Sequence, residues 1–217
     1  MRIAVLLGGC GLYDGTDVQE AVLTFLALEE AGEKPVLVAP DREQERTVDH
    51  LSAEADPEQK RNVLREAARL ARGAVRALGD VRPDDLEALI IPGGYGPVVN
   101  FSSGFARAGE AWHIVPEVEA FLRHFLDAGK PIGLVSLGEV PVRAVLGQEL
   151  QVAPPPADPG RVTIDRERRI VHTPGFSAFA RLQDVRAGIE AMVAEVIKMM
   201  EERVGRERAA DAARRQA

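Results

Sequence analysis

The sequence has almost no cysteine, because Cys10 is the only one among its 217 residues. A single thiol excludes an intramolecular disulfide and a cysteine-rich zinc site, since each needs at least two sulfurs. The fold must therefore be held by its apolar core, and a chain of this length can bury roughly 70% of the surface that its unfolded form exposes. Scarce cysteine suits a reducing compartment, so we expect the protein in the cytoplasm.

Long apolar runs and an excess of positive charge are also missing. No stretch approaches the ~18 apolar residues of a membrane span, and the run Ile3–Leu7 is shorter than the apolar core of a signal peptide. Lys and Arg number 27 against 34 Asp and Glu, a net charge of −7. Because nucleic-acid binding depends on clustered basic residues, we expect neither a nucleic acid nor a membrane as a partner. No set of residues has the spacing of a metal site.

Four short apolar runs are present instead, and they are typical of parallel strands covered on both faces. These runs are 3–7, 35–39, 88–91 and 131–135. Helical patterns follow at 17–31, 61–71, 117–128 and 178–204. Strands that alternate with helices predict an α/β fold with a mostly parallel central sheet. We treat residues 1–205 as one domain and residues 206–217 as a frayed basic tail.

Two segments interrupt this alternation. Residues 41–59 are charged and weakly periodic, which indicates a cap or insertion rather than part of the core. Residues 152–160 hold four prolines and indicate a stiff connection. This connection leads into two short extended pieces at 161–165 and 169–173.

Glycine-containing turns follow three of the strands, at 8–15, 92–96 and 136–138. Ligands of open α/β sheets bind beyond the carboxyl ends of the strands, so we expect these turns to converge on one pocket for a small molecule. A dinucleotide fingerprint is not satisfied, because Gly15 comes one place late and Asp14 would face the pyrophosphate. We therefore expect no cofactor.

The turn at Ser136 carries the pattern with the most chemistry. The strand that precedes it ends on this hydroxyl residue, and Gly138 follows two places later. This is half of a nucleophile elbow, which exposes a nucleophile and aims backbone N–H groups at a developing oxyanion. The glycine expected two places before the nucleophile is Leu134 here. The pattern leaves open the alternative that Ser136 only caps the next helix.

Ordered motifs over about residues 1–146, and again from 169, resemble one known family. They include Gly9–Gly15, Glu20–Leu23, Ala88–Gly96, Gly129–Gly133 and Thr173-Pro174. The chain resembles the ElbB family of glyoxalase-like isoprenoid-biosynthesis proteins, in the ThiJ/PfpI branch of the class I glutamine amidotransferase-like superfamily. The resemblance implies a flavodoxin-like three-layer sandwich, usually a homodimer.

The resemblance also implies a site of three parts. The elbow residue is the nucleophile, a glutamate on the first helix shares a proton with it, and a glycine turn supplies oxyanion N–H groups. Carried over to this chain, these parts are Ser136, Glu20, and Gly93 with Gly94. Leu137 would add its own N–H.

Other candidates surround these. His172 ends a late strand, on the segment where the superfamily often brings a side chain to the nucleophile, and is a candidate base. Cys10 is either a small residue in a crowded loop or a displaced nucleophile at the pocket rim. Asp14, Tyr95 and Asn100 are candidate pocket-lining polar groups.

Ser136 is also the main departure from the family, because relatives carry cysteine at the elbow. A hydroxyl is a weaker nucleophile than a thiolate and needs a positioned base. Residues 152–160 replace a longer excursion in the relatives, which shortens part of the pocket wall. The implied function is a cofactor-free, weakened glyoxalase that converts small 2-oxoaldehydes, such as methylglyoxal, to hydroxy acids. The alternatives are an inactive module that binds a small metabolite or a partner, and a serine-type small hydrolase.

Overall fold

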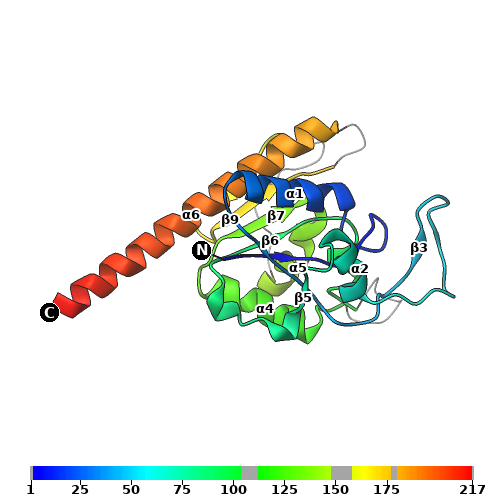
Figure 1. Ribbon diagram of the computed structural model, residues 1–217, viewed down its shortest axis with the longest axis horizontal. Helices are drawn as coiled ribbons and strands as arrows, with labels where there is room; N and C mark the ends of the chain where they lie inside the picture. The colour runs from blue at the N-terminus through cyan, green and yellow to red at the C-terminus, as the bar shows by residue number, and fades with distance from the viewer. Residues whose placement is uncertain (1, 104–111, 148–157, 177–179, 217) are drawn as a thin grey trace.

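A seven-stranded sheet forms the centre of the computed structural model, which describes residues 2–103, 112–147, 158–176 and 180–216 (Figure 1). Its strand order is β5-β2-β1-β6-β7-β9-β8. The strands are β1 Ile3–Leu6, β2 Val36–Ala39, β5 Arg76–Ala77, β6 Ala88–Ile91, β7 Ile132–Val135, β8 Thr163–Asp165 and β9 Ile170–Thr173. All neighbours pair in parallel except β8 and β9, which are antiparallel. The mostly parallel sheet is therefore confirmed.

Helices cover both faces of this sheet. They are α1 Val18–Glu30, α2 Val63–Leu70, α3 Gly96–Val99, α4 Pro116–Asp127, α5 Glu139–Leu146 and α6 Leu182–Gln216. Helices α1, α2 and α6 pack with Ile3 and Val5 in one core cluster. Helices α4 and α5 pack with Ala4 and Leu6 in the other. Successive residues of a strand point to opposite faces, so the apolar run of β1 is buried on both sides and the fold is the expected three-layer sandwich.

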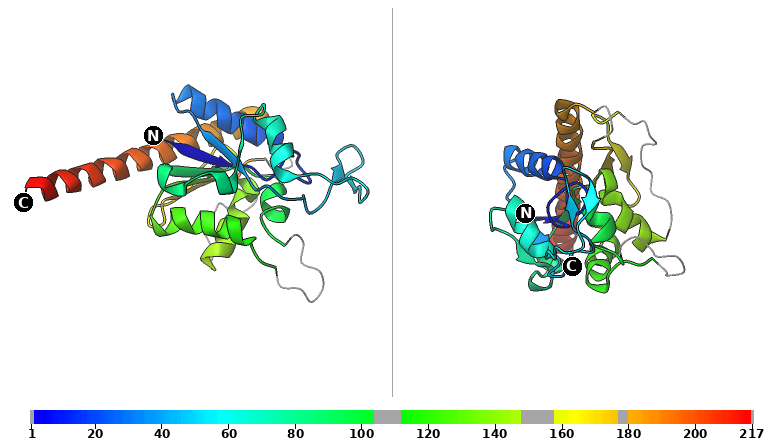
Figure 2. Two further views of the ribbon diagram at one scale, coloured as in Figure 1. Left: turned by 60° about the horizontal axis from the view of Figure 1, so that its bottom comes forward. Right: turned by 90° about the vertical axis from the view of Figure 1, so that its right-hand side faces the viewer.

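Helix α6 is longer than the pattern predicts. It runs without a break to Gln216 and projects past the body of the protein (Figures 1 and 2), through residues expected to form a frayed tail. The apolar stripe that marks its buried face ends near Met200, which is fully buried. Beyond it, alanine and arginine favour helix by intrinsic propensity, a signal that hydrophobic periodicity does not detect.

The charged segment 41–59 lies outside the sheet, as expected for a cap. It contains a small antiparallel pair, β3 Val48–Asp49 and β4 Glu54–Ala55. The proline-rich connection 152–160 falls mostly outside the described residues. Within the described ranges, no helix combines the length and apolar character needed to cross a membrane.

Candidate functional site

Ser136 has a left-handed backbone conformation, with φ of 51°, directly after β7. This conformation is costly for a residue with a side chain and is concentrated at functional turns. Helix α5 is preceded by Gly138, and the structure shows no side-chain capping hydrogen bond at this end of the helix. The geometry therefore favours an elbow at Ser136 over a helix cap.

A close approach to the neighbouring strand holds this turn in place. A β-carbon on Gly138 would collide with the carbonyl oxygen of Ile91, the last residue of β6. Glycine at 138 is thus required by packing, which is the physical reason for the Ser-Leu-Gly sequence. Leu134, in the place of the expected elbow glycine, is fully buried in the sheet.

Glu20 reaches the elbow from the first turn of α1. The Asp17 side chain caps this helix by accepting hydrogen bonds from the N–H groups of Gln19 and Glu20, both at 2.9 Å. The Glu20 side chain is 1% exposed, and its Oε2 accepts a hydrogen bond of 2.8 Å from the Gly93 N–H. Its Oε1 accepts one of 3.1 Å from the Phe176 N–H. Two turns at the carboxyl edge of the sheet thus hold the carboxyl group.

Glu20 and Ser136 both lie close to Gly93 and Gly175. A β-carbon built on Gly93 would lie 2.5 Å from Glu20 Oε2 and 2.8 Å from the Ser136 β-carbon. A β-carbon on Gly175 would lie 2.9 Å from the Ser136 β-carbon and would collide with Glu20 Oε1. Glycine on both sides therefore lets the carboxyl group and the elbow residue come together.

Burial and, to a lesser extent, the nearby charge of Asp17 raise the pKa of Glu20 to about 8, although the two backbone hydrogen bonds act to lower it. The carboxyl group is therefore largely protonated at pH 7. A neutral carboxylic acid has one proton to donate. Glu20 can thus act as an acid toward a substrate oxygen, rather than as a ready base for the Ser136 hydroxyl.

The glycine turn after β6 differs from its expected role in one respect. The N–H of Gly93, expected at an oxyanion, already donates to Glu20, so Gly93 positions the acid. Gly94 has φ of +81°, and a β-carbon there would lie 2.5 Å from the Asp17 nitrogen at the start of α1. Leu137 lies half-buried beside Ser136.

Gly175 and Phe176 are site residues that sequence reasoning missed. Gly175 has φ of +65° and follows Pro174 immediately after β9. A Pro-Gly pair at the carboxyl end of a buried strand is a turn signal at the edge where ligands bind. That signal was available, but the partner of the turn, Glu20, lies far away in the sequence.

His172 lies beside the elbow, on β9, paired with Leu134 of β7. It is 5% exposed, and its Nε2 lies 3.4 Å from the backbone carbonyl oxygen of Ser136. Burial lowers its pKa, and the Glu139 carboxylate opposes this shift. The structure therefore brings the candidate base to Ser136 as a neutral imidazole, in contact with its carbonyl group rather than its hydroxyl.

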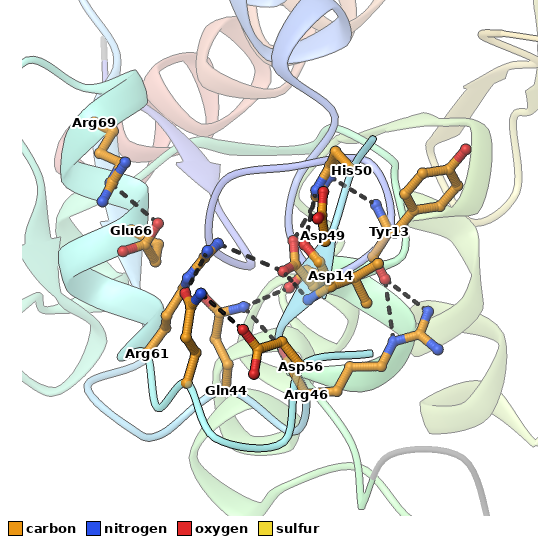
Figure 3. Close-up of polar contacts among 12 residues, drawn as sticks. Tyr13, Asp14, Gln44, Arg46, Asp49, His50, Asp56, Arg61, Glu66 and Arg69 are labelled. Atoms are coloured by element: carbon orange, nitrogen blue, oxygen red, sulfur yellow. Dashed lines mark hydrogen bonds and ion pairs between the residues drawn. The ribbon is translucent and has the colours of Figure 1, made fainter. Parts of the chain in front are cut away.

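Asp14 lies in a different network, where the first glycine turn meets the cap (Figure 3). It is fully buried, and its Oδ2 accepts a 2.8 Å hydrogen bond from the Val48 N–H. Arg61 and His50 lie 3.6 and 3.8 Å from its carboxylate oxygens. These contacts give Asp14 a part in fastening the cap to the turn.

Asn100 belongs to the same network and is also fully buried. Its Nδ2 donates to the carbonyl oxygens of Gly8 and Asp14, at 2.8 and 2.9 Å. Tyr95 lies under the Arg46 guanidinium, which is 5.6 Å from the ring centroid. The structure thus places Asp14, Asn100 and Tyr95, which were expected to line the pocket, where the first glycine turn meets the cap. They take no part in the contacts that hold Glu20 and His172.

Cys10 is half-buried, and burial raises the pKa of its thiol. The charges that act on it most come from Glu66 and Arg69 on α2, and from Asp14 and Arg61. Neither Glu20 nor His172 is among them. A protonated thiol is a poor nucleophile, so the geometry favours the loop role over the displaced nucleophile. Within the described ranges, no group of three or more His, Cys, Asp and Glu side chains could hold a metal ion.

Comparison with known proteins places the chain among relatives of similar length. It is 33% identical to the human glutamine amidotransferase-like class 1 domain-containing protein 3, mitochondrial, over 91% of this chain and 83% of that protein. The chain is also 33% identical to the rat ES1 protein homolog, mitochondrial, over 91% of this chain and 84% of that protein. An isoprenoid biosynthesis protein with an amidotransferase-like domain from Ehrlichia chaffeensis superposes with a TM-score of 0.85 at 31% identity, covering 92% of this chain and all of that one. No protein-family model matches.

The fold and these relatives define a class I glutamine amidotransferase-like protein. A ThiJ/PfpI domain protein from Brachyspira murdochii shares the fold, with a TM-score of 0.53 at 12% identity over 91% of this chain and 96% of that one. Within this class, the chain belongs to the family of ES1 and the ElbB isoprenoid-biosynthesis proteins. The resemblance is thereby confirmed.

The expectation of a cytoplasmic setting is contradicted by these relatives. The human and rat proteins are both named as mitochondrial. The expectation rested on the single cysteine, and a low cysteine count indicates reducing conditions without distinguishing one reducing compartment from another.

Proposed function

We propose that the protein converts small 2-oxoaldehydes to 2-hydroxy acids at Ser136, without a cofactor. One juxtaposition supports this proposal above the others. A hydroxyl residue held in a left-handed turn packs against the same two glycines, Gly93 and Gly175, as Glu20, a buried and largely protonated acid. An exposed glutamate would ionise well below pH 7, so the protonated state of Glu20 is a consequence of this buried position.

The chemistry needs one nucleophile and one proton shuttle. The Ser136 oxygen adds to the aldehyde carbon, while Glu20 gives its proton to the aldehyde oxygen and receives the proton of the hydroxyl. The hydrogen on that carbon then moves as a proton to the neighbouring carbonyl carbon, while the proton of the newly formed hydroxyl group moves to the ketone oxygen, so the former aldehyde carbon becomes a carbonyl carbon again. The product is a Ser136 ester of the 2-hydroxy acid, which water hydrolyses. Overall, one 2-oxoaldehyde and one water give one 2-hydroxy acid.

The expected rate is low for a physical reason. Glu20 is largely protonated and can take the Ser136 proton only as it gives up its own, so the attacking hydroxyl is neutral and a poor nucleophile. No described side chain accepts a hydrogen bond from the Ser136 hydroxyl, since His172 contacts the carbonyl oxygen of this residue. The same observation disfavours a serine-type hydrolase, which depends on that base.

The test is lactate formation from methylglyoxal. The native protein should produce lactate, and Ser136→Ala should not. Ser52→Ala is a matched control, because Ser52 is exposed on the cap and distant in sequence from the elbow. Lactate at equal rates from native protein and Ser136→Ala would contradict the proposal.

A second candidate is a module that binds a small carbonyl compound without turnover. It is favoured by the same missing base, because a pocket can keep its shape after its chemistry is lost. Binding of methylglyoxal analogues with no lactate from the native protein would select this candidate.

We also propose that the protein forms a homodimer. Val18, Val22 and Leu26 follow one another by single turns along α1 and are 43%, 50% and 37% exposed. A contiguous apolar stripe of this kind is typical of a protein interface. Analytical ultracentrifugation should show a dimer that Val22→Glu dissociates, and a native monomer would contradict it.

A further inference from the structure

Two buried polar atoms near Ser136 have no hydrogen-bond partner among the described residues. They are Nδ1 of His172 and Oε2 of Glu139. Buried polar atoms in folded proteins almost always have a hydrogen-bond partner. Two such atoms without a partner beside a functional turn therefore need an explanation. The steps proposed for Ser136 and Glu20 use neither atom.

Both side chains flank the elbow, from two different elements. Glu139 begins α5, three residues after Ser136, and its other oxygen accepts a hydrogen bond of 3.3 Å from Arg143. His172 comes from β9 and touches the Ser136 carbonyl through Nε2. The Glu139 carboxylate acts on the His172 ring strongly enough to favour its charged form, although burial outweighs this effect. The two unpaired atoms thus belong to one neighbourhood.

Hydrogen-bond chemistry assigns the same role to both atoms. A carbonyl oxygen only accepts, so the contact with Ser136 places the proton of the neutral His172 ring on Nε2. Nδ1 is then left with a lone pair, which is an acceptor. Oε2 of a carboxylate is also an acceptor. Two unpaired acceptors that flank the same turn favour a hydrogen-bond donor from a bound molecule.

We propose that Glu139 and His172 form a subsite that accepts a hydrogen bond, shared between them, from a hydroxyl group of the substrate on the carbon next to its ketone group. A neutral donor suits the subsite better than an ammonium group, because Arg143 already places a positive charge on Glu139. The substrate class is therefore a hydroxylated 2-oxoaldehyde, such as 3-hydroxy-2-oxopropanal, rather than methylglyoxal. A methyl group in this position leaves both acceptors buried and unpaired. The reaction part of this inference rests on the proposed function, but the binding part does not.

The binding part is tested on Ser136→Ala, which cannot add to a carbonyl group through this residue. Hydroxyacetone and acetone are the probes, because they differ by a single hydroxyl group and neither is an aldehyde. Ligand-observed NMR titrations should give hydroxyacetone an affinity at least about tenfold higher, since hydrogen bonds to a charged acceptor are the strong ones. Equal affinities, or no detectable binding of hydroxyacetone, would overturn the subsite.

Variants of the same protein assign the preference to Glu139. Glu139→Leu, added to Ser136→Ala, should abolish the difference in affinity between hydroxyacetone and acetone. Glu119→Leu is the matched control, because Glu119 on α4 also pairs with an arginine four residues later and should leave the preference intact. If Glu139→Leu does not fold, Glu139→Gln keeps the test decisive, since a neutral amide oxygen is a weaker acceptor and should reduce the preference severalfold. A preference unchanged in a folded Glu139 variant would overturn the assignment.

Kinetics on the protein with Ser136 intact separate the two proposals. The native protein should have a higher kcat/KM for 3-hydroxy-2-oxopropanal than for methylglyoxal. A higher affinity for hydroxyacetone than for acetone, without turnover of either aldehyde, would reject the proposed reaction and support the subsite. Turnover of both aldehydes at the same kcat/KM, together with equal affinities for the two ketones, would support the proposed reaction and reject the subsite.

Discussion

Glu20 and Ser136 meet across Gly93: a methyl group on that glycine would lie 2.5 Å from the carboxyl oxygen of one and 2.8 Å from the β-carbon of the other. The glutamate comes from the first helix and the serine from the end of β7, and the N–H of Gly93 holds the glutamate. Since the carboxyl ends of parallel strands lie along one edge, the fold itself produces this meeting. The predictions below follow from it.

Gly93→Ala should destabilise the protein by about 1–3 kcal/mol, because the added methyl group would overpack the space between Glu20 and Ser136. Urea unfolding monitored by circular dichroism measures the change. Gly79→Ala is the control, since a β-carbon there has open space around it. Equal unfolding free energies for the two variants would contradict the described packing.

Stability should fall as pH rises from 6.5 to 8. The pKa of Glu20 is raised in the folded state to about 8 from its ordinary value of 4.5, so the folded state binds more protons than the unfolded state in this window. Its contribution is complete below the unfolded pKa and is lost toward the folded pKa, at ~1.4 kcal/mol per pH unit. The pKa of His172 is lowered in the folded state, so this residue acts in the opposite direction, mainly below its ordinary value of 6.5, and it offsets the slope only at the low end of this window.

Urea unfolding at several pH values tests this slope. Glu20→Gln should remove it, because an amide does not titrate in this range. The comparison concerns slopes alone, since the amide nitrogen cannot accept a backbone hydrogen bond and lowers stability at every pH. Parallel pH profiles for native protein and variant would show that Glu20 is not protonated as described.

Ser136→Cys should raise lactate formation from methylglyoxal by roughly tenfold or more, because sulfur is the better nucleophile at neutral pH. The assay is best made in a Cys10→Ser background, so that a single thiol is present. Peroxide consumption by the same variant gives a second measure of its reactivity. An inert thiol at 136 would mean that the pocket no longer supports addition chemistry.

Cys10 should react with iodoacetamide more slowly than free cysteine at pH 8, because burial raises the pKa of its thiol. Its modification should leave lactate formation unchanged, since the groups that surround it differ from those around Ser136. Mass spectrometry follows the labelling. Loss of activity in step with labelling would assign Cys10 a part in the reaction.

The sequence predicts the strands and the elbow well because their signals are local. The buried run Ile132–Val135 and the glycine at 138 define a strand and a tight turn within seven residues. Glu20 could be assigned only from the resemblance, since a carboxylate in the first turn of a helix is ordinarily solvated. Its protonation depends on its burial in the folded protein, and its partner Phe176 comes from a distant part of the sequence, so neither could be predicted from local pattern.

Asp14 and Glu139 show why the rest of the site could not be predicted. From the sequence, Asp14 in a glycine-rich loop could either line a pocket or hold the loop to another segment. Its hydrogen bond to Val48 depends on the position of the cap, which has too little hydrophobic pattern to be placed from the sequence. Glu139 forms an i,i+4 pair with Arg143, which in sequence is typical of an exposed helix face. Its unpaired buried oxygen is visible only once the helix is packed beside His172.

Lactate formation from methylglyoxal, compared between the native protein, Ser136→Ala and Ser52→Ala, is the measurement that tests the central claim most directly. A site built from Ser136 and Glu20 predicts slow but measurable lactate from the native protein and from Ser52→Ala, and none above background from Ser136→Ala. Lactate at the same rate from all three proteins, or from none of them, would contradict it.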